Sequence, residues 1–182
     1  MSSKRFVLVL CSVFTTVTLA GATPPAESFV AAQFTNAPVV STLALTGEVA
    51  TAVQGIMGYP YPQGEIAYWE AEGRTVWILE GRGRSSMITA GFVVRDGKLE
   101  KTEVLVYRES RGKQVRSRSF TRQFEGALLT EDRQLNRRID SITGATISVK
   151  AMQAMARTAL FLHQRVSCAR TAQSDTEALS LQ

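Results

Sequence analysis

Residues 91–107 read GFVVRDGKLEKTEVLVY, and this stretch decides the fold class. Two runs rich in β-branched and aromatic residues flank Asp96-Gly97, a dipeptide typical of two-residue hairpin turns. A third run of the same kind, R-T-V-W-I-L-E, precedes the pair and is followed by glycines. The sequence therefore predicts an antiparallel meander of at least three strands, over 74–80, 87–95 and 99–107.

A helical pattern follows the strands. From Ile147 to about Val166, apolar residues recur at three- and four-residue spacing, which is typical of a helix packed on a core. Phe120 and Phe124 have the same spacing and indicate a short helix within 116–126. We predict an α+β fold, in which an antiparallel sheet is covered by a C-terminal helix. The polar residues 170–182 are expected to form a flexible tail.

The first 22 residues have the order of regions found in secretory signal peptides. Lys4 and Arg5 precede an apolar run of about 15 residues, and Ala20-Gly21-Ala22 is a cleavage site of the A-x-A type. The run is shorter than the roughly 20 residues that a membrane-spanning helix needs. We expect export, to the periplasm or the outer face of the cytoplasmic membrane. An uncleaved, membrane-associated anchor is the main alternative.

The segment 23–58 is predicted to be an N-terminal arm or linker, because three prolines lie among small residues at its start. Within it, a helix is expected from about Glu48 to Met57. The segment 59–169 is predicted to be the functional domain.

The composition excludes several kinds of redox site. Removal of the signal peptide leaves Cys168 as the only cysteine, so neither an intramolecular disulfide nor a cysteine ligand set is available. His163 is the only histidine and is expected at a polar edge of the helix. No C-x-x-C-H motif for covalent haem occurs. If the protein has a redox centre, we therefore expect an organic cofactor or one borrowed from a partner, and no metal site. No residue is assigned a catalytic role. The net charge of +5 does not imply nucleic acid, which an exported protein would not ordinarily meet.

The run DSITGATIS, residues 140–148, comes directly before the helical pattern. In a structural interpretation, Thr146 is the N-cap and its hydroxyl bonds a free N–H group of the first turn, while Gly144 permits an unusual backbone angle. In a functional interpretation, the helix N-terminus binds a phosphate, and the small Gly144 and Ala145 give a bulky group access to Thr146.

Residues 140–146 match D-x-x-[ST]-[SG]-A-T, the flavinylation motif of the FMN-binding domain family. The chain resembles the peripheral flavin subunits of sodium-pumping NADH:quinone reductases and Rnf-type complexes. The hairpin of 91–110, an F-x-x-Q-F-x-G segment and the closing helix follow the family's order. The resemblance implies FMN bound covalently to Thr146 through a phosphoester. The other cofactor-binding candidates are Asp140, Thr143, Gly144, Ala145, Ser148, Arg108 and Glu109.

A threonine hydroxyl is a poor nucleophile without an adjacent base or metal, and the single histidine lies 17 positions further along. The resemblance implies a separate modifying enzyme, an FAD- and Mg-dependent flavin transferase. It also implies an exported electron-transfer flavoprotein, with a membrane-bound or periplasmic redox partner and no independent reaction. Two alternatives stay open: a small flavin-dependent reductase acting on a soluble acceptor, and a non-redox adaptor domain that keeps the fold.

The segment 105–139 contains nine basic and four acidic residues. It is either a solvated face or a positive rim around the flavin, which would favour the anionic reduced form and attract an acidic redox partner. Tyr68, Trp69 and Trp77 could stack on the flavin, but packing within the sheet is the simpler expectation. Residues 81–86 lack a phosphate-loop pattern and are interpreted as a turn.

Overall fold

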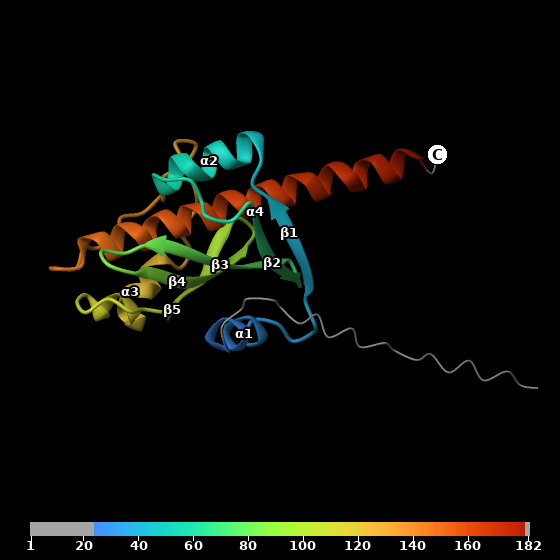
Figure 1. The fold of residues 1–182 in the computed structure, drawn as a ribbon. Coiled ribbons are helices and arrows are strands. Elements are labelled where there is room, and N and C mark those ends of the chain that lie inside the picture. Colours follow the sequence, from blue (N-terminus) through green and yellow to red (C-terminus); the bar gives the residue numbers. More distant parts are fainter. Residues whose placement is uncertain (1–23, 181–182) are drawn as a thin grey trace, which may run out of the picture.

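The computed structural model describes residues 24–180, so the predicted signal peptide lies outside the described residues. Five antiparallel strands form a meander in the order β1-β2-β3-β4-β5, with helices on both faces (Figure 1). The strands are β1 (Val39–Ala44), β2 (Glu65–Ala71), β3 (Arg74–Arg82), β4 (Met87–Arg95) and β5 (Lys98–Val106). The helices are α1 (Pro24–Ala31), α2 (Gly47–Met57), η1 (Lys113–Arg116), α3 (Arg118–Thr121), η2 (Arg122–Phe124) and α4 (Thr146–Ser180).

The predicted α+β fold is confirmed, and its three predicted strands are β3, β4 and β5. Asp96 and Gly97 both have positive φ, 50° and 72°, as a type I′ hairpin turn requires. Glu72 and Gly73 connect β2 to β3 with similar angles, 55° and 73°. The meander therefore turns tightly at this end of the sheet, and the wider connection between β3 and β4 lies at the other end.

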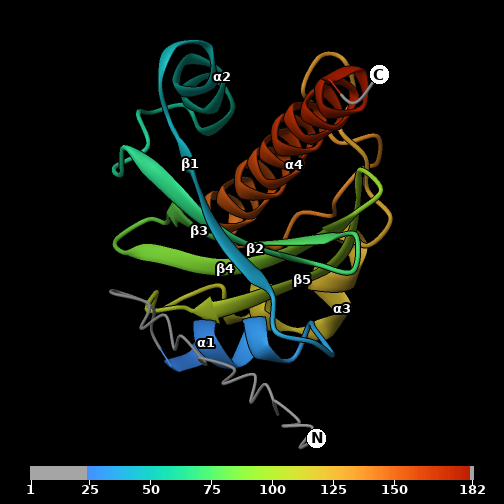
Figure 2. The ribbon, with the colours of Figure 1, turned by 90° about the vertical axis from the view of Figure 1, so that its right-hand side faces the viewer.

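The main core lies between the sheet and α4, which crosses one face of the sheet with α2 beside it (Figures 1 and 2). Trp77 and Phe92 of the sheet and Met152 and Met155 of α4 are fully buried there. Trp77 stacks on Tyr68, with ring centroids 4.7 Å apart. The expectation that these aromatic residues pack within the sheet is confirmed.

The opposite face of the sheet is covered by α1 (Figure 2). Phe29 and Val30 pack on Trp69, Val76 and Val93. The described part of 23–58 thus contains α1, β1 and α2, where the sequence predicted mainly an arm or linker; the helix expected near 48–57 is α2. Prolines are well tolerated in the first turn of a helix, so Pro24-Pro25 begins α1 rather than preventing it.

Two further segments differ from the prediction. Residues 116–126 do not form one short helix but part of a succession of short turns, η1, α3 and η2, in which Phe120 and Phe124 pack edge to face at 5.6 Å. Helix α4 continues through Ser180, well into the stretch expected as a tail. Within residues 24–180, no helix combines the length and hydropathy that crossing a membrane requires.

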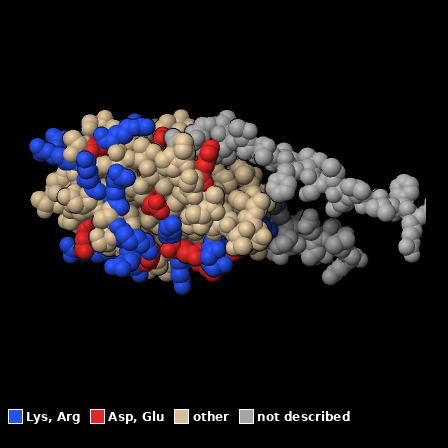
Figure 3. Space-filling view, turned by 90° about the horizontal axis from the view of Figure 1, so that it is seen from below, with Lys and Arg blue, Asp and Glu red and all other residues tan. Residues whose placement is uncertain are grey.

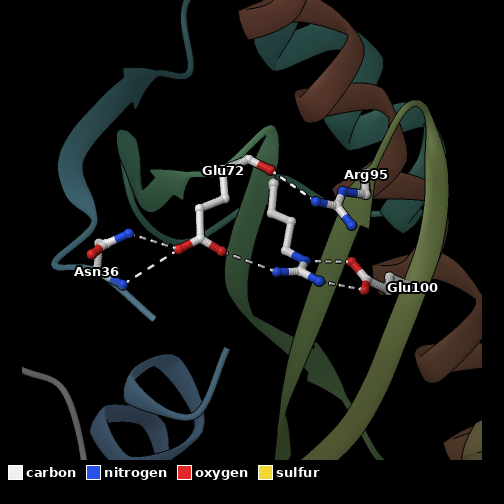
Figure 4. A network of polar contacts seen from close by, with 5 residues as sticks. Asn36, Glu72, Arg95 and Glu100 are labelled. Atoms are coloured by element: carbon white, nitrogen blue, oxygen red, sulfur yellow. Dashed lines mark hydrogen bonds and ion pairs between the residues drawn. The ribbon is translucent and has the colours of Figure 1, made fainter. Parts of the chain in front are cut away.

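The end of the sheet with the tight turns is held by a polar network (Figure 4). Arg74 makes a bidentate ion pair with Glu100, with Nε–Oε2 at 2.7 Å and Nη2–Oε1 at 2.8 Å. This hydrogen bonding lowers the pKa of Glu100. Glu72 accepts hydrogen bonds from Asn36, while its carbonyl accepts one from Arg95. The network joins the loop after α1 to the sheet.

His163 belongs to the interior at this same end. Its side chain is buried, Nδ1 lies 2.8 Å from Thr75 Oγ1, and Nε2 accepts a hydrogen bond from the Gly97 N–H at 3.3 Å. Burial lowers its pKa, which keeps the ring neutral and able to accept. The prediction of a polar-edge histidine is therefore wrong: His163 fastens α4 to the β4–β5 turn.

Candidate functional site

A pocket of about 590 Å³ opens where α4 begins. His163 lies further along α4, next to the tight turn between β4 and β5. Three stretches that are far apart in the sequence form its walls. The first is the turn between β3 and β4, the second follows β5, and the third is the motif at the start of α4. The lining residues are Arg84, Ser85, Glu109, Ser110, Arg111, Gly144, Ala145, Thr146, Ile147 and Ser148.

Thr146 is the first residue of α4 and is exposed in this pocket. The Ala145 carbonyl accepts the first helical hydrogen bond, from Val149 N–H at 3.0 Å, so Ala145 holds the N-cap position. The Thr146 hydroxyl makes no hydrogen bond to any described residue, so the capping interpretation is not supported. The free N–H groups of a first helical turn attract an anion, and the unpartnered hydroxyl stands beside them.

The motif bends sharply just before the helix. Gly144 has φ +79°, a left-handed conformation that favours glycine, and a side chain placed there would meet no atom within 4 Å. Ala145 N–H donates to the Ile142 carbonyl at 2.9 Å and closes the turn. Ala145 is buried against Gly112: a Cβ at Gly112 would stand 2.6 Å from the Ala145 Cβ. The loop after β5 is therefore packed directly on the motif.

Glu109 holds the β3–β4 turn to the loop after β5. Its carboxylate accepts hydrogen bonds from Ser85 Oγ at 2.7 Å, Ser85 N–H at 2.8 Å and Ser86 N–H at 2.9 Å. These bonds, that of the Ser85 hydroxyl first, lower the pKa of Glu109 to about 2. Gly83 leaves room for the carboxylate, because a Cβ there would lie 2.3 Å from Glu109 Oε1.

Ser148 also has an internal partner. Tyr107 O–H donates to the Arg111 carbonyl at 2.6 Å, so the contact of 3.1 Å between Ser148 Oγ and Tyr107 Oη has serine as the donor. The Ser148 side chain lines the pocket, but its proton is used within the protein. This chain of bonds fixes the backbone at Arg111, a residue that lines the pocket.

The remaining predicted site residues lie around the pocket. Thr143 lines an adjoining hollow of about 350 Å³ together with Arg111 and Lys113. Asp140 and Arg108 are exposed and line neither of these two hollows. The Asp140 N–H donates to Gln123 Oε1 at 2.8 Å, which fastens the motif to the F-x-x-Q-F-x-G segment. The structure thus brings Glu109, Gly144, Ala145, Thr146 and Ser148 into one pocket and leaves the other three outside it.

Sequence reasoning missed Arg84, Ser85, Ser110 and Ile147 as pocket residues. The predicted turn is confirmed over residues 83–86, where Gly83 N–H donates to the Ser86 carbonyl at 2.9 Å, whereas Gly81 and Arg82 still belong to β3. The position of the turn next to the motif depends on the pairing of β3 with β4 and on Glu109. The serines beside Gly83 were the only local signal.

Residues 83–161 match the FMN-binding domain, and the match includes all three stretches that line the pocket. These residues belong to the FMN-binding domain family. The family indicates a flavin-binding module for electron transfer. No curated protein matches the chain.

The residues of the pocket fit the phosphate of FMN. The FMN-binding domain offers the start of a long helix and two guanidinium groups, those of Arg84 and Arg111, and both kinds of group favour a phosphate. The one carboxylate of the pocket, on Glu109, is occupied by three hydrogen bonds. The chemistry of the walls therefore favours an anion beside Thr146.

Proposed function

We propose that this protein is an exported electron-transfer flavoprotein that carries FMN on Thr146 through a phosphoester bond. The observation that supports this most directly is the exposed, unpartnered Thr146 hydroxyl at the start of α4. A phosphodiester at this position would be stabilised by the helix dipole and by Arg84 and Arg111. Bound FMN would supply a centre that accepts two electrons and releases them singly.

We attribute the attachment to a separate flavin transferase that uses FAD and Mg²⁺. Transfer forms one bond between Thr146 Oγ1 and phosphorus, breaks the pyrophosphate bond of FAD, and releases AMP and the hydroxyl proton. The pocket offers no base for this step, because the Glu109 carboxylate has its pKa lowered to about 2 and is occupied. A weak base of this kind would not activate threonine.

The pocket contains no further acid or base, which favours an electron carrier over an enzyme with its own substrate. We therefore propose that the domain passes electrons between a membrane-bound component and another exported redox protein. Attachment suits this place, because a dissociated cofactor would be lost outside the cytoplasm.

The test is intact-protein mass spectrometry of the full chain, expressed with and without an active flavin transferase. We expect a mass increase of FMN less water that requires the transferase and disappears in Thr146→Ala. Thr46→Ala is the matched control and should keep the modification, because Thr46 is an exposed threonine at the start of α2 and lies outside the pocket and the motif. The same spectrum would show removal of residues 1–22 on export. An unmodified wild-type chain beside a working transferase would contradict the proposal.

A further inference from the structure

We infer that the mouth of this pocket is a docking surface for an acidic redox protein. The inference rests on the proposed function for its purpose, electron exchange, but the surface itself is defined by charges and shape that do not depend on the flavin.

Three hollows meet around Thr146. The pocket shares Arg111 and Gly144 with the adjoining hollow of about 350 Å³. On its other side it shares Ile147 with a hollow of about 440 Å³ between α2 and α4. Six basic residues line the three hollows and are called the cationic rim below: Arg82, Arg84, Arg111, Lys113, Lys150 and Arg157.

No residue of the cationic rim forms an ion pair with a described acid. Ion pairs are found elsewhere, and they use other cations: Arg74, Lys101, Arg118, Arg165 and Arg170. Two rim residues are held by uncharged neighbours. Arg82 lies 4.1 Å from the centroid of the Tyr59 ring, and Arg157 donates to Gln134 Oε1 at 2.9 Å. The other four are exposed.

The cofactor does not account for this much positive charge. Glu109 is the only acid that lines the three hollows, so the six cations leave an excess of five positive charges. A phosphodiester would neutralise one of them. Seen from below, Lys and Arg side chains, with acidic ones among them, lie mostly on the half of the described surface that is farther from the grey residues (Figure 3). Such a field accelerates association with an oppositely charged protein and orients it.

The shape favours a protein over a lipid surface. Ile147, 47 % exposed, stands between two of the hollows, so an apolar residue lies within a charged rim, as in many protein interfaces. A flat membrane would contact the rim without entering the hollows. A protein that carries its own redox centre can place a convex surface into the two flanking hollows while the flavin occupies the pocket.

The probe is a plant-type ferredoxin, an acidic iron–sulfur protein of low potential, with basic cytochrome c as its opposite. Affinity for oxidised ferredoxin would be measured on the flavinylated protein and on Thr146→Ala. We expect binding to both, weakened about tenfold between 20 mM and 300 mM salt. In the flavinylated protein, the rate at which reduced ferredoxin reduces the flavin should also fall over the same range of salt concentration. Cytochrome c should bind more weakly than ferredoxin.

Lys113→Glu should lower ferredoxin affinity about fivefold or more at low salt, whereas Lys98→Glu, the same charge reversal at the far end of the sheet, should change it less than twofold. Equal losses in both variants, or affinity that does not respond to salt, would overturn the inference. So would a third result, measured with phosphatidylglycerol vesicles: Lys113→Glu abolishes vesicle binding and leaves ferredoxin affinity unchanged. Because Thr146→Ala lacks the attachment site, failure of flavinylation would not affect these binding results.

Discussion

Glu109 is the one carboxylate in a pocket whose other charged residues are arginines, and its hydrogen bonds explain how it is accommodated there. All three bonds come from the β3–β4 turn, so the carboxylate is a structural part of the wall that presents Arg84 and Ser85. Its position next to Gly83 leaves no space for a side chain at residue 83. At this scale, one residue connects two of the three stretches that form the pocket.

Glu109→Gln should loosen the turn, because an amide has only one acceptor oxygen for three donors. We expect lower flavin incorporation per mole of protein, measured by absorbance, with Glu103→Gln on the exposed side of β5 as the control.

The lowered pKa of Glu109 also makes the stability of the fold depend on pH. The ionised carboxylate stabilises the fold above about pH 4.5, and this stability is lost as the pH falls toward 2.

Urea unfolding of unflavinylated protein at pH 5 and pH 3 would measure that dependence. The wild type should lose more stability between these two pH values than Glu109→Gln does. Equal losses would show that the carboxylate is not the group responsible.

At the scale of elements, the pocket depends on close packing between the loop after β5 and the start of α4. Gly112 has φ +78° and faces the Cβ of Ala145 and the hydroxyl of Tyr107, at 2.6 Å and 2.8 Å from a Cβ built on it. Both the backbone angle and the space require glycine. The loop therefore cannot carry a side chain at this position without moving away from the motif.

Gly112→Ala should shift the loop and reduce flavin incorporation several-fold. Gly97→Ala is a matched control, because its φ of +72° brings the same backbone cost of ~1 kcal/mol while its Cβ would meet no atom within 4 Å. Absorbance and the melting temperature, measured on both variants, separate the backbone cost of the substitution from the displacement of the loop. Normal incorporation in Gly112→Ala would show that the loop does not need this contact.

The sequence predicts some elements much better than others. β3, β4 and β5 consist of dense β-branched runs around a strong turn signal, so local preference and final structure agree. β1 and β2 were missed because β1 is a half-exposed edge strand and β2 has a mixed pattern of burial without a clear alternation. Their pairing depends on neighbours that a sequence pattern does not reveal.

The same limit applies to the site. The motif led directly to Thr146, because its residues are contiguous. Arg84 and Ser85 reach the pocket only through the β3–β4 pairing and the bonds to Glu109, which join positions 24 residues apart. Contacts of this kind follow from the completed sheet and not from a local pattern.

At the scale of the whole molecule, the sheet is covered on both faces. α4 and α2 cover one face, and α1 covers the other through Phe29, which lies against Gly91. A Cβ at Gly91 would stand 2.4 Å from the Phe29 ring, so the ring fits into the gap left by the glycine. The segment that resembles a linker in the sequence is thus part of the folded body.

Phe29→Ala should lower the free energy of unfolding by about 3 kcal/mol, because it empties a site in which the ring is 4 % exposed. Flavin incorporation should be unchanged, since α1 contributes no residue to the pocket. Urea unfolding of the unmodified chain measures the first quantity, and absorbance the second. A change below about 0.5 kcal/mol would show that α1 does not pack on the sheet in solution.

The position of Thr146 at the start of α4 has a mechanical consequence. The helical turns that follow it are held in the core by the buried Met152 and Met155, so the main chain at Thr146 has a fixed position. A group esterified there could pivot only about its own bonds, unlike one carried on a long swinging arm. The electron donor and the electron acceptor would therefore have to bind at the same opening one after the other. The rate at which they replace each other would limit the overall rate of electron transfer.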